Sequence, residues 1–507
     1  MSAQRLGLSL DEQRPEPLYQ QIFEAITDRI KSGAFPPGFR LPPTRALAAE
    51  LGAHRNTVVR AYSELTEAGF LEGTVGRGTY VRDAPERREA PSEPAMSGSL
   101  PWTALLSERS RGESLARARR ITRAAGRGQY VNLARMQPAP ELIPDALFRR
   151  CLDHVLRTLG GRALGYAPYE GLPRLREAIA IDLARQGVPA RAEEVLITSG
   201  SQQALDLVAR ALVDPGDVVL THELTYAGAV QIFGASGARL AGVPSDARGP
   251  DLAWLRSAGR AKALYLMPNH INPTGGMIER TRREELVRWS REMGVPIIED
   301  DYAADLELDG QAPPPAMRAL SGDVVYMSTY SKRLIPALRI GFILAPPSLE
   351  PHLSSLKHAS DLGTSLLTQH ALAEMLERGY VEAHVARMRE EYRERRDALV
   401  AGLRKHLPRG VDFTVPQRGL TVWLNLPAEL DPDALFEEAR RRGVLVSPST
   451  LHRVDRGGAG PRGVRLTFCW EKPARLVEGA KRLGEAIDAL SSTRSRAHAR
   501  GEAMSVV

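Results

Sequence analysis

Lys332 lies in the segment "STYSKRLIPALRIGF", residues 328–342, and its residue type is unusual for this chain. Only seven of the 68 Lys and Arg residues are lysines, so nearly all cationic side chains of the chain are arginines. A guanidinium stays protonated in proteins, whereas a lysine amine can lose its proton and attack a carbonyl carbon to form an imine. A surface lysine with no chemical role would also account for Lys332, so the surrounding residues must decide.

A second candidate group follows an apolar stretch in "IIEDDYAADL". Here a strand-like run leads into Asp300, Asp301 and Tyr302, and a buried carboxylate requires a cationic partner. Because side chains alternate along a strand, Asp300 and Tyr302 are expected on one face and Asp301 on the other. Asp300 could keep a pyridine nitrogen protonated, and Tyr302 could hydrogen-bond a phenolic oxygen.

Several groups suit a phosphate. In "ITSGSQQALDLVARAL" a strand passes through glycine into a helix, whose first N–H groups, at Ser201 and Gln202, could bind an anion. Thr329 and Arg339, on either side of Lys332, add a hydroxyl and a cation. A glycine before a helix is common, so this pattern has weight only in combination with the others.

Two further residues suit a flat ring. Tyr226 in "HELTYAGAV" follows a strand and could stack on a planar cofactor, although a core or surface tyrosine is the commoner case. Asn272 in "MPNHINPTGG" precedes a proline, where a simple turn is the alternative. Taken together, the imine-forming Lys332, the pyridine-nitrogen partner Asp300 and the phosphate groups specify pyridoxal 5'-phosphate.

These residues require elements that bring them to one edge of a sheet. From residue 190 onward, apolar strand-like runs alternate with helical patterns, which predicts an α/β fold with a mainly parallel sheet covered on both faces. In such folds ligands bind at the carboxyl ends of the strands. The predicted strands lie in "EEVLITSG", "DVVLTHE", "ARLAGVPS", "AKALYLMPN", "GVPIIEDDY" and "DVVYMSTYS".

The N-terminal residues predict a different module. An apolar stripe in "PLYQQIFEAITDRIKSG" indicates a first helix, and "PTRALAAELG" a second, with Thr44 as its possible N-cap. A tight glycine turn leads to a third helix, "HRNTVVRAYSELTEAG", which should bury Val58, Ala61, Tyr62 and Leu65. Two short helices across such a turn form a helix-turn-helix. "FLEGTVGRGTYV" then predicts a β-hairpin wing.

Charge placement on this module fits DNA. Arginine can contact guanine bidentately, and asparagine or threonine can reach bases or phosphates. A solvated charged helix face is the alternative for any single arginine, but the whole set favours double-stranded DNA as partner. The expected DNA-binding residues are Arg45, Arg55, Asn56, Thr57, Arg60 and, at the wing tip, Arg77.

Composition divides the chain of 507 residues into parts. We expect a DNA-binding domain at 12–83, a linker at 84–128 with a short helix near 103–107, a large domain at 129–490 and a disordered tail at 491–507. Two cysteines cannot form a disulfide framework, and no signal peptide or apolar run of membrane-spanning length is seen. A cytoplasmic protein without membrane contact is therefore expected, and the net charge of +7 is compatible with a polyanionic partner.

Residues 17–81 resemble the winged-helix domain of the GntR family, with Pro43 and His54 where that family usually shows serine, which removes possible caps or phosphate contacts. Residues 129–490 resemble fold-type I, class I aminotransferases through "YAPYEGLPRLREAIA", "SGSQQAL", "NPTG", "EDDYAADL", "TYSKRLIPALRIGF" and "GVRLTF". The combination resembles the MocR/GabR branch of GntR regulators. That resemblance implies a homodimer and the following roles: Lys332 as imine lysine; Asp300, Tyr302, Asn272, Tyr226, Ser201, Gln202, Thr329 and Arg339 as cofactor contacts; Tyr166 as a contact to the neighbouring subunit's phosphate; and Arg465 as the residue that binds an effector carboxylate.

Two functions remain open at this point. The first is a transcription regulator that senses an amino acid or related amine through aldimine exchange. The second is a working aminotransferase whose DNA-binding module is vestigial or autoregulatory. The intact recognition helix and wing favour the first. However, regulators of this branch often carry an aromatic residue where this chain has Asn272, and the spelling "NHINPTG" is closer to working aminotransferases, so transamination stays open.

Overall fold

The computed structural model describes residues 6–8, 10, 16–74, 78–82, 100, 102–107, 110, 129–454 and 460–504. The chain divides into two compact units, Met1–Leu105 and Leu106–Val507, and each is described by itself. Most of the expected linker lies outside the described residues. Its predicted short helix is present as α4, Trp102–Leu105.

The first unit is a small helical core with a three-stranded sheet. Apolar side chains of the three helices, among them Ile26, Leu47, Val58 and Leu65, are buried together. The strands pair antiparallel in the order β1-β3-β2, which forms the predicted hairpin. The elements are α1 Leu18–Lys31, β1 Arg40–Leu41, α2 Thr44–Leu51, α3 Arg55–Glu67, β2 Leu71–Thr74 and β3 Gly78–Val81.

The ends of the helices differ from the sequence expectation in two details. Thr44 is the first residue of α2, and the N-cap position is taken by Pro43, which offers no side-chain hydrogen bond. At α3 the cap is His54, whose Nδ1 accepts a hydrogen bond from the backbone N–H of Asn56 at 3.2 Å. The imidazole therefore supplies the acceptor that a serine would have supplied. Gly52 ends α2 with φ +63, the left-handed conformation that the tight turn requires.

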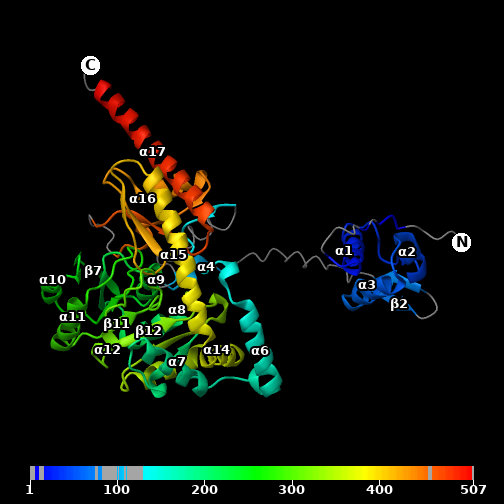
Figure 1. The fold of residues 1–507 in the computed structure, drawn as a ribbon, viewed down its shortest axis with the longest axis horizontal. Helices are drawn as coiled ribbons and strands as arrows, with labels where there is room; N and C mark the ends of the chain where they lie inside the picture. The colour runs from blue at the N-terminus through cyan, green and yellow to red at the C-terminus, as the bar shows by residue number, and fades with distance from the viewer. Residues whose placement is uncertain are drawn as a thin grey trace. The chain divides into compact units, whose positions relative to one another are not determined.

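A seven-stranded sheet forms the centre of the second unit, in the order β5-β13-β12-β11-β10-β6-β7. Its strands β7, β11 and β12 are labelled in Figure 1. All six predicted strands are present and run parallel to one another. Their bounds are β5 Val195–Thr198, β6 Val218–His222, β7 Arg239–Val243, β10 Ala263–Leu266, β11 Ile297–Asp300 and β12 Val325–Thr329.

The seventh strand, β13 Gly341–Leu344, was not predicted. It pairs antiparallel with both β12 and β5 and so separates them. The connection from β12 to β13 is short and contains no crossover helix long enough to return the chain to the opposite edge, so an antiparallel neighbour is the available geometry. This connection carries Lys332 and Arg339.

Helices cover both faces of the sheet because alternate strand residues face opposite cores. On β10, Tyr265 belongs to the core beneath α8 and α9, whereas Leu264 and Leu266 pack toward α10 and α11. The edge made by β5 and β13 packs on α7 and α14. These helices are α6 Asp145–Leu159, α7 Pro173–Arg185, α8 Ser201–Leu212, α9 Ala227–Ala235, α10 Leu252–Ser257, α11 Arg280–Met293, α12 Met317–Leu320, α13 Glu350–Asp361 and α14 Leu366–Glu377.

The C-terminal part of this unit adds a second sheet, of order β14-β15-β18-β17, and two long helices, α15 and α17, which pack along each other (Figure 1). Gly402 on α15 allows this approach, because a Cβ there would lie 2.9 Å from the Cβ of Ala480. The helix α17 continues through residue 491 to Met504, which differs from the disordered tail expected there. The elements are α15 Tyr380–His406, β14 Asp412–Thr414, β15 Thr421–Asn425, α16 Pro432–Arg441, β16 Val444–Leu445, β17 Ser447–Pro448, β18 Gly463–Thr467 and α17 Pro473–Met504; β16 pairs with β4 Val131–Asn132, and β8 Ser245–Asp246 with β9 Gly249–Pro250.

Candidate functional site

The predicted site residues follow the carboxyl ends of the parallel strands. Since these ends meet at one edge of the sheet, residues separated by more than about 100 positions can converge there. Ser201 begins α8 after β5, and Tyr226 precedes α9 after β6. Asn272 follows β10, Asp300 ends β11, and Thr329 ends β12 just before Lys332.

Lys332 reaches a backbone oxygen from a distant part of the chain. Its Nζ donates to the carbonyl oxygen of Met136 at 2.6 Å. Burial lowers the pKa of Lys332 below its usual value, and the positive charges of Arg465 and Arg339 lower it further, against the opposing effect of Asp300. A lowered pKa makes the neutral amine, the form able to attack a carbonyl carbon, more accessible.

Asp300 is buried and only half satisfied. Its Oδ2 accepts a hydrogen bond from the hydroxyl of Tyr265 at 2.6 Å, while its Oδ1 has no partner among the described residues. The hydroxyl of Tyr302 is also buried without a partner there. Burial raises the pKa of Asp300 to about 7, and the neighbouring Asp301 raises it as well.

These two unpartnered atoms fit pyridoxal phosphate. A buried polar atom without a partner costs about 1–3 kcal/mol, so such atoms require an occupant. The free oxygen of Asp300 suits a protonated ring nitrogen, and the hydroxyl of Tyr302 suits the phenolic oxygen of the same ring. Lys332 supplies the amine for the aldehyde. The donor set therefore matches this cofactor group by group.

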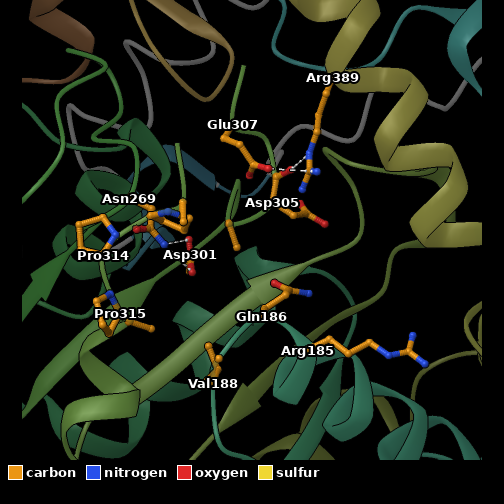
Figure 2. A pocket seen from close by; sticks show the side chains of 15 residues that line it. Arg185, Gln186, Val188, Asn269, Asp301, Asp305, Glu307, Pro314, Pro315 and Arg389 are labelled. Carbon is orange, nitrogen blue, oxygen red and sulfur yellow. Dashed lines mark hydrogen bonds and ion pairs between the residues drawn. The ribbon is translucent and has the colours of Figure 1, made fainter. Parts of the chain in front are cut away.

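Asp301 lies on the opposite side of the strand end, as the alternation of side chains predicts. Both of its carboxylate oxygens accept from Asn269 Nδ2, at 3.0 and 2.9 Å, and Oδ2 also accepts from the hydroxyl of Tyr326 at 3.0 Å. Figure 2 shows Asp301 and Asn269 facing each other in a pocket that Pro314 also lines. The consecutive carboxylates of Asp300 and Asp301 thus serve separate environments.

Two glycines shape the expected phosphate site. Gly200 has φ +88 and precedes the first turn of α8, and a Cβ there would lie 2.7 Å from Nη2 of Arg339. A Cβ on Gly341 would lie 2.8 Å from the backbone nitrogen of Ser201. The guanidinium of Arg339 and the N-terminus of α8 are close together for this reason, and both attract an anion.

Other side chains lie around the expected phosphate site, and their polar atoms already make hydrogen bonds within the protein. The hydroxyl of Tyr226 donates to Oε1 of Gln202 at 2.9 Å. The Oγ1 of Thr329 lies 3.0 Å from Oγ of Ser331 and 3.1 Å from the carbonyl oxygen of Ile340. A phosphate hydrogen bond from Thr329 would have to replace one of these contacts.

Arg465 is held close to Asn272. Its Nη1 donates to Oδ1 of Asn272 at 3.0 Å, and its Nη2 donates to the carbonyl oxygen of Ala134 at 2.9 Å. The Nε of Arg465 is buried without a partner among the described residues. A buried guanidinium with a spare donor suits a carboxylate.

Tyr166 is the one predicted cofactor contact that the chain does not bring to this site. Its side chain is 87% exposed, after a short helical turn at Gly160–Leu164. Sequence reasoning also missed Tyr265 and the carbonyl oxygen of Met136. A signal for Tyr265 existed, because it is a tyrosine in an otherwise aliphatic strand that neighbours the strand of Asp300. The contact of Met136 has no signal in the sequence.

On the first unit, the predicted DNA-binding residues differ in exposure and in the contacts that their side chains make. Arg45, Arg55 and Asn56 are exposed, and Thr57 is half-buried. Arg60 is exposed but engaged: its Nε lies 3.0 Å from Oε1 of Glu64, and its guanidinium lies 3.6 Å from the centre of the Tyr19 ring. Arg77 lies outside the described residues.

The sheet, the lysine and the two unpartnered acceptor and donor groups define a pyridoxal-phosphate-binding domain of fold type I, and the first unit is a winged helix-turn-helix. Residues 129–483 match the family "Aminotransferase class I and II", and residues 18–81 match "Bacterial regulatory proteins, gntR family". The chain belongs to the MocR/GabR-type branch of GntR regulators, in which a winged helix is fused to an aminotransferase-like domain.

Individual relatives include both regulators and enzymes. The chain is 32% identical to the probable rhizopine catabolism regulatory protein MocR of Rhizobium meliloti, over 96% of this chain and 97% of that protein. It is 35% identical to a 2-aminoadipate transaminase of Thermus thermophilus, over 73% of this chain and 94% of the enzyme. The crystal structure of LysN, an alpha-aminoadipate aminotransferase of Thermus thermophilus complexed with N-(5'-phosphopyridoxyl)-L-leucine, superimposes with a TM-score of 0.71 at 32% identity, covering 78% of this chain and all of that one.

The chain is thus a GntR-type transcriptional regulator with an aminotransferase-like domain, and its cofactor is pyridoxal 5'-phosphate. Within the part of the chain that the structure describes, no helix is long and apolar enough to cross a membrane.

Proposed function

We propose that this regulator senses an amino acid or related amine at the cofactor site and changes its DNA binding in response. The observation that supports the proposal is that one chain carries both a helix α3 with exposed polar residues at its start, such as Arg55 and Asn56, and, around Lys332, the unpartnered polar atoms of Asp300 and Tyr302. When bound, pyridoxal phosphate supplies an aldehyde that condenses reversibly with primary amines. An effector amine would compete with Lys332 for that aldehyde.

The chain's own residues determine what such an effector must contain. The lowered pKa of Lys332 favours its release as a neutral amine, and Asp300 would keep the ring nitrogen of the bound cofactor protonated. Arg465, with its unpartnered Nε, would orient a carboxylate on the effector. An amino acid meets all of these requirements. A bound effector changes DNA binding only to the extent that it binds the two conformations of the regulator unequally.

A second function is favoured by one specific observation. The hydrogen bond of 3.0 Å from Arg465 to Asn272 would hold the guanidinium in place for a substrate carboxylate, in a chain that is also 35% identical to a transaminase. Under this alternative the domain transfers amino groups and the DNA-binding module is autoregulatory or vestigial. The proton transfers would then fall to the Lys332 amine.

A gel-shift titration with the DNA upstream of the chain's own coding region separates the two functions. We expect specific binding by the cofactor-loaded protein and a shift in affinity on addition of an amino acid. A parallel assay with the same amino acids and a 2-oxo acid acceptor measures transamination. Turnover without specific DNA binding would support the enzyme and overturn the regulator.

We also propose that the protein is a cytoplasmic homodimer in which Tyr166 reaches the phosphate site of the partner subunit. Its exposure of 87% is unusual for a tyrosine, and exposed apolar residues such as Leu164 and Leu362 accompany it. Two winged helices would then read two half-sites of one operator. Light scattering tests this directly, because a monomer of about 55.5 kDa at working concentration would contradict the dimer.

A further inference from the structure

Lys357 is a second unusual lysine in this arginine-rich chain. It lies on α13, and its side chain is fully buried. Its Nζ donates to both oxygens of Asp361, one turn later on the same helix, at 2.8 Å each. A buried ammonium without a partner would be costly, so the two charges stabilise each other. Burial lowers the pKa of Lys357, and the hydrogen bond to Asp361 opposes this effect.

Asp361 connects this ion pair to the loop before α8. Its Oδ2 accepts from Oγ of Ser199 at 3.2 Å and from Nε2 of Gln203 at 2.8 Å. Its Oδ1 accepts from the backbone N–H of Gly363 at 2.9 Å. Burial acts to raise the pKa of Asp361, but the hydrogen bonds from Lys357, Gln203 and Gly363 outweigh it and hold the pKa below its usual value. The carboxylate is therefore charged and saturated with donors.

The side-chain amide of Gln203 links Asp361 to the backbone of Ser199. Because its Nε2 faces Asp361, its Oε1 faces the backbone N–H of Ser199, from which it accepts a hydrogen bond of 2.7 Å. The carbonyl oxygen of Ser199 accepts from Nη2 of Arg339 at 3.0 Å, and its hydroxyl lies 3.2 Å from Oγ1 of Thr364. Both backbone polar groups and the side chain of Ser199 are thus held.

This matters because Ser199 is followed by Gly200, the most adaptable residue of the expected phosphate site. Glycine at φ +88 has little intrinsic preference to stay there, so the direction of the N–H groups that open α8 depends on what holds its neighbours. The same segment after α13 also packs on the loop after Tyr166. A Cβ on Gly363 would lie 3.0 Å from the carbonyl oxygen of Ala167.

We propose that Lys357 and Asp361 are positioning residues for the cofactor's phosphate: the ion pair fixes Gln203 and Ser199, and these fix the N-terminus of α8. The inference requires the phosphate at this helix end but no sensing role, so it can hold even if effector sensing fails. The pair would contribute to the binding of the phosphate and not to the binding of the ring, which Asp300, Tyr302 and Lys332 would hold from the ends of β11 and β12.

The test compares the affinity of the cofactor-free full chain for pyridoxal 5'-phosphate with its affinity for pyridoxal, which lacks the phosphate. Both are followed by the visible absorption that appears on reaction with Lys332. Asp361→Asn keeps the shape of the side chain and removes its charge. In this variant we expect the preference for the phosphorylated form to fall about tenfold, which corresponds to the loss of one hydrogen bond to a charged group. The affinity for pyridoxal should stay within about twofold of wild type.

Lys357→Met should show the same selective loss, because it leaves Asp361 charged without its ammonium partner. The matched control is Lys262→Met, which removes a half-exposed lysine 3.7 Å from Asp217 and should change neither affinity. If Lys357→Met does not fold, Ser199→Ala is the alternative variant. It removes only the hydroxyl that donates to Asp361, and it should still lower the preference for pyridoxal 5'-phosphate over pyridoxal. Equal losses for both compounds, or unchanged affinities, would overturn the proposal.

Discussion

The hydroxyl of Tyr265 lies 2.6 Å from one oxygen of the buried Asp300, while the other oxygen of Asp300 has no partner among the described residues. Tyr265 thus fixes the orientation of the carboxylate and leaves its second oxygen available to a ligand. Burial raises the pKa of Asp300 to about 7, from an ordinary value of 3.8, and the hydrogen bond from Tyr265 opposes this rise. A protonated ring nitrogen would complete the carboxylate with both a donor and a positive charge.

This arrangement predicts a pH dependence in the cofactor-free protein. Between about pH 4 and 7 the folded protein keeps a proton on Asp300 that the unfolded chain releases, so the free energy of unfolding falls as the pH rises through this window. Asp300→Asn removes that loss. Its stability relative to wild type should increase with pH, by roughly 4 kcal/mol at most at pH 8.

Denaturant unfolding of both cofactor-free proteins at pH 4.5, 6 and 8, with a precision of about 0.5 kcal/mol, measures the difference. Glu299 and Asp301 are also buried with raised pKa values, but they are present in both proteins and largely cancel. A stability difference that does not change between pH 4.5 and pH 8 would show that the ionisation of Asp300 is not opposed by the fold.

Replacement of the imine lysine should affect cofactor binding and leave DNA binding intact. We expect Lys332→Ala to lose the visible absorption of the lysine-bound cofactor and to retain operator binding, because Lys332 belongs to the second unit and the recognition helix to the first. Effector-dependent changes in DNA affinity should disappear. Absorption spectra and gel shifts on the same preparation measure both properties. Lys405→Ala, an exposed lysine at the end of α15, is the control and should behave as wild type.

The two arginines of the recognition helix should not contribute equally to DNA binding. Arg55 is exposed at the start of α3, whereas Arg60 is paired with Glu64 and stacked on Tyr19. Arg55→Ala should weaken operator binding by about 1–3 kcal/mol, and Arg60→Ala by less.

Binding isotherms at several salt concentrations distinguish a base contact from a phosphate contact, since loss of a phosphate contact lowers the salt dependence by about one unit. Arg60→Ala should instead lower the melting temperature of the first unit slightly, through the loss of its contact with Tyr19. Should Arg55→Ala bind the operator as wild type does at every salt concentration, the assignment of this helix face to DNA would be wrong.

Arg465 should set the requirement for a carboxylate on the effector. In wild type, an amino acid should bind more tightly than the amine obtained by its decarboxylation. Arg465→Gln should remove about 1.5–3 kcal/mol of that preference, the range for a hydrogen bond to a charged group. Spectral titrations with both compounds measure it. Arg462→Gln is a suitable control, because Arg462 is exposed and donates to the carbonyl oxygen of Ala428. An unchanged preference would place the carboxylate elsewhere.

Local patterns in the sequence were sufficient for most of the architecture. Continuous apolar runs predicted the six parallel strands, since a strand buried on both faces must be apolar throughout. Polar residues at or just after the ends of those runs, such as Asp300 at the end of β11 and Asn272 after β10, predicted the edge of the sheet for the ligand site. The apolar stripe and the glycine turn at Gly52 predicted the helix-turn-helix. Each of these signals is contained within a few neighbouring residues.

Contacts between distant segments were decided only by the tertiary structure. Nothing near Lys332 in the sequence points to Met136, 196 residues away, or near Arg465 to Asn272, 193 residues away. The antiparallel β13, the hydrogen bond from Tyr265 to Asp300 and the engagement of Arg60 by Tyr19 depend likewise on strand order and packing. The physical reason is that residue type and spacing determine which face of an element is buried, whereas the atoms that meet there depend on which other element packs against it.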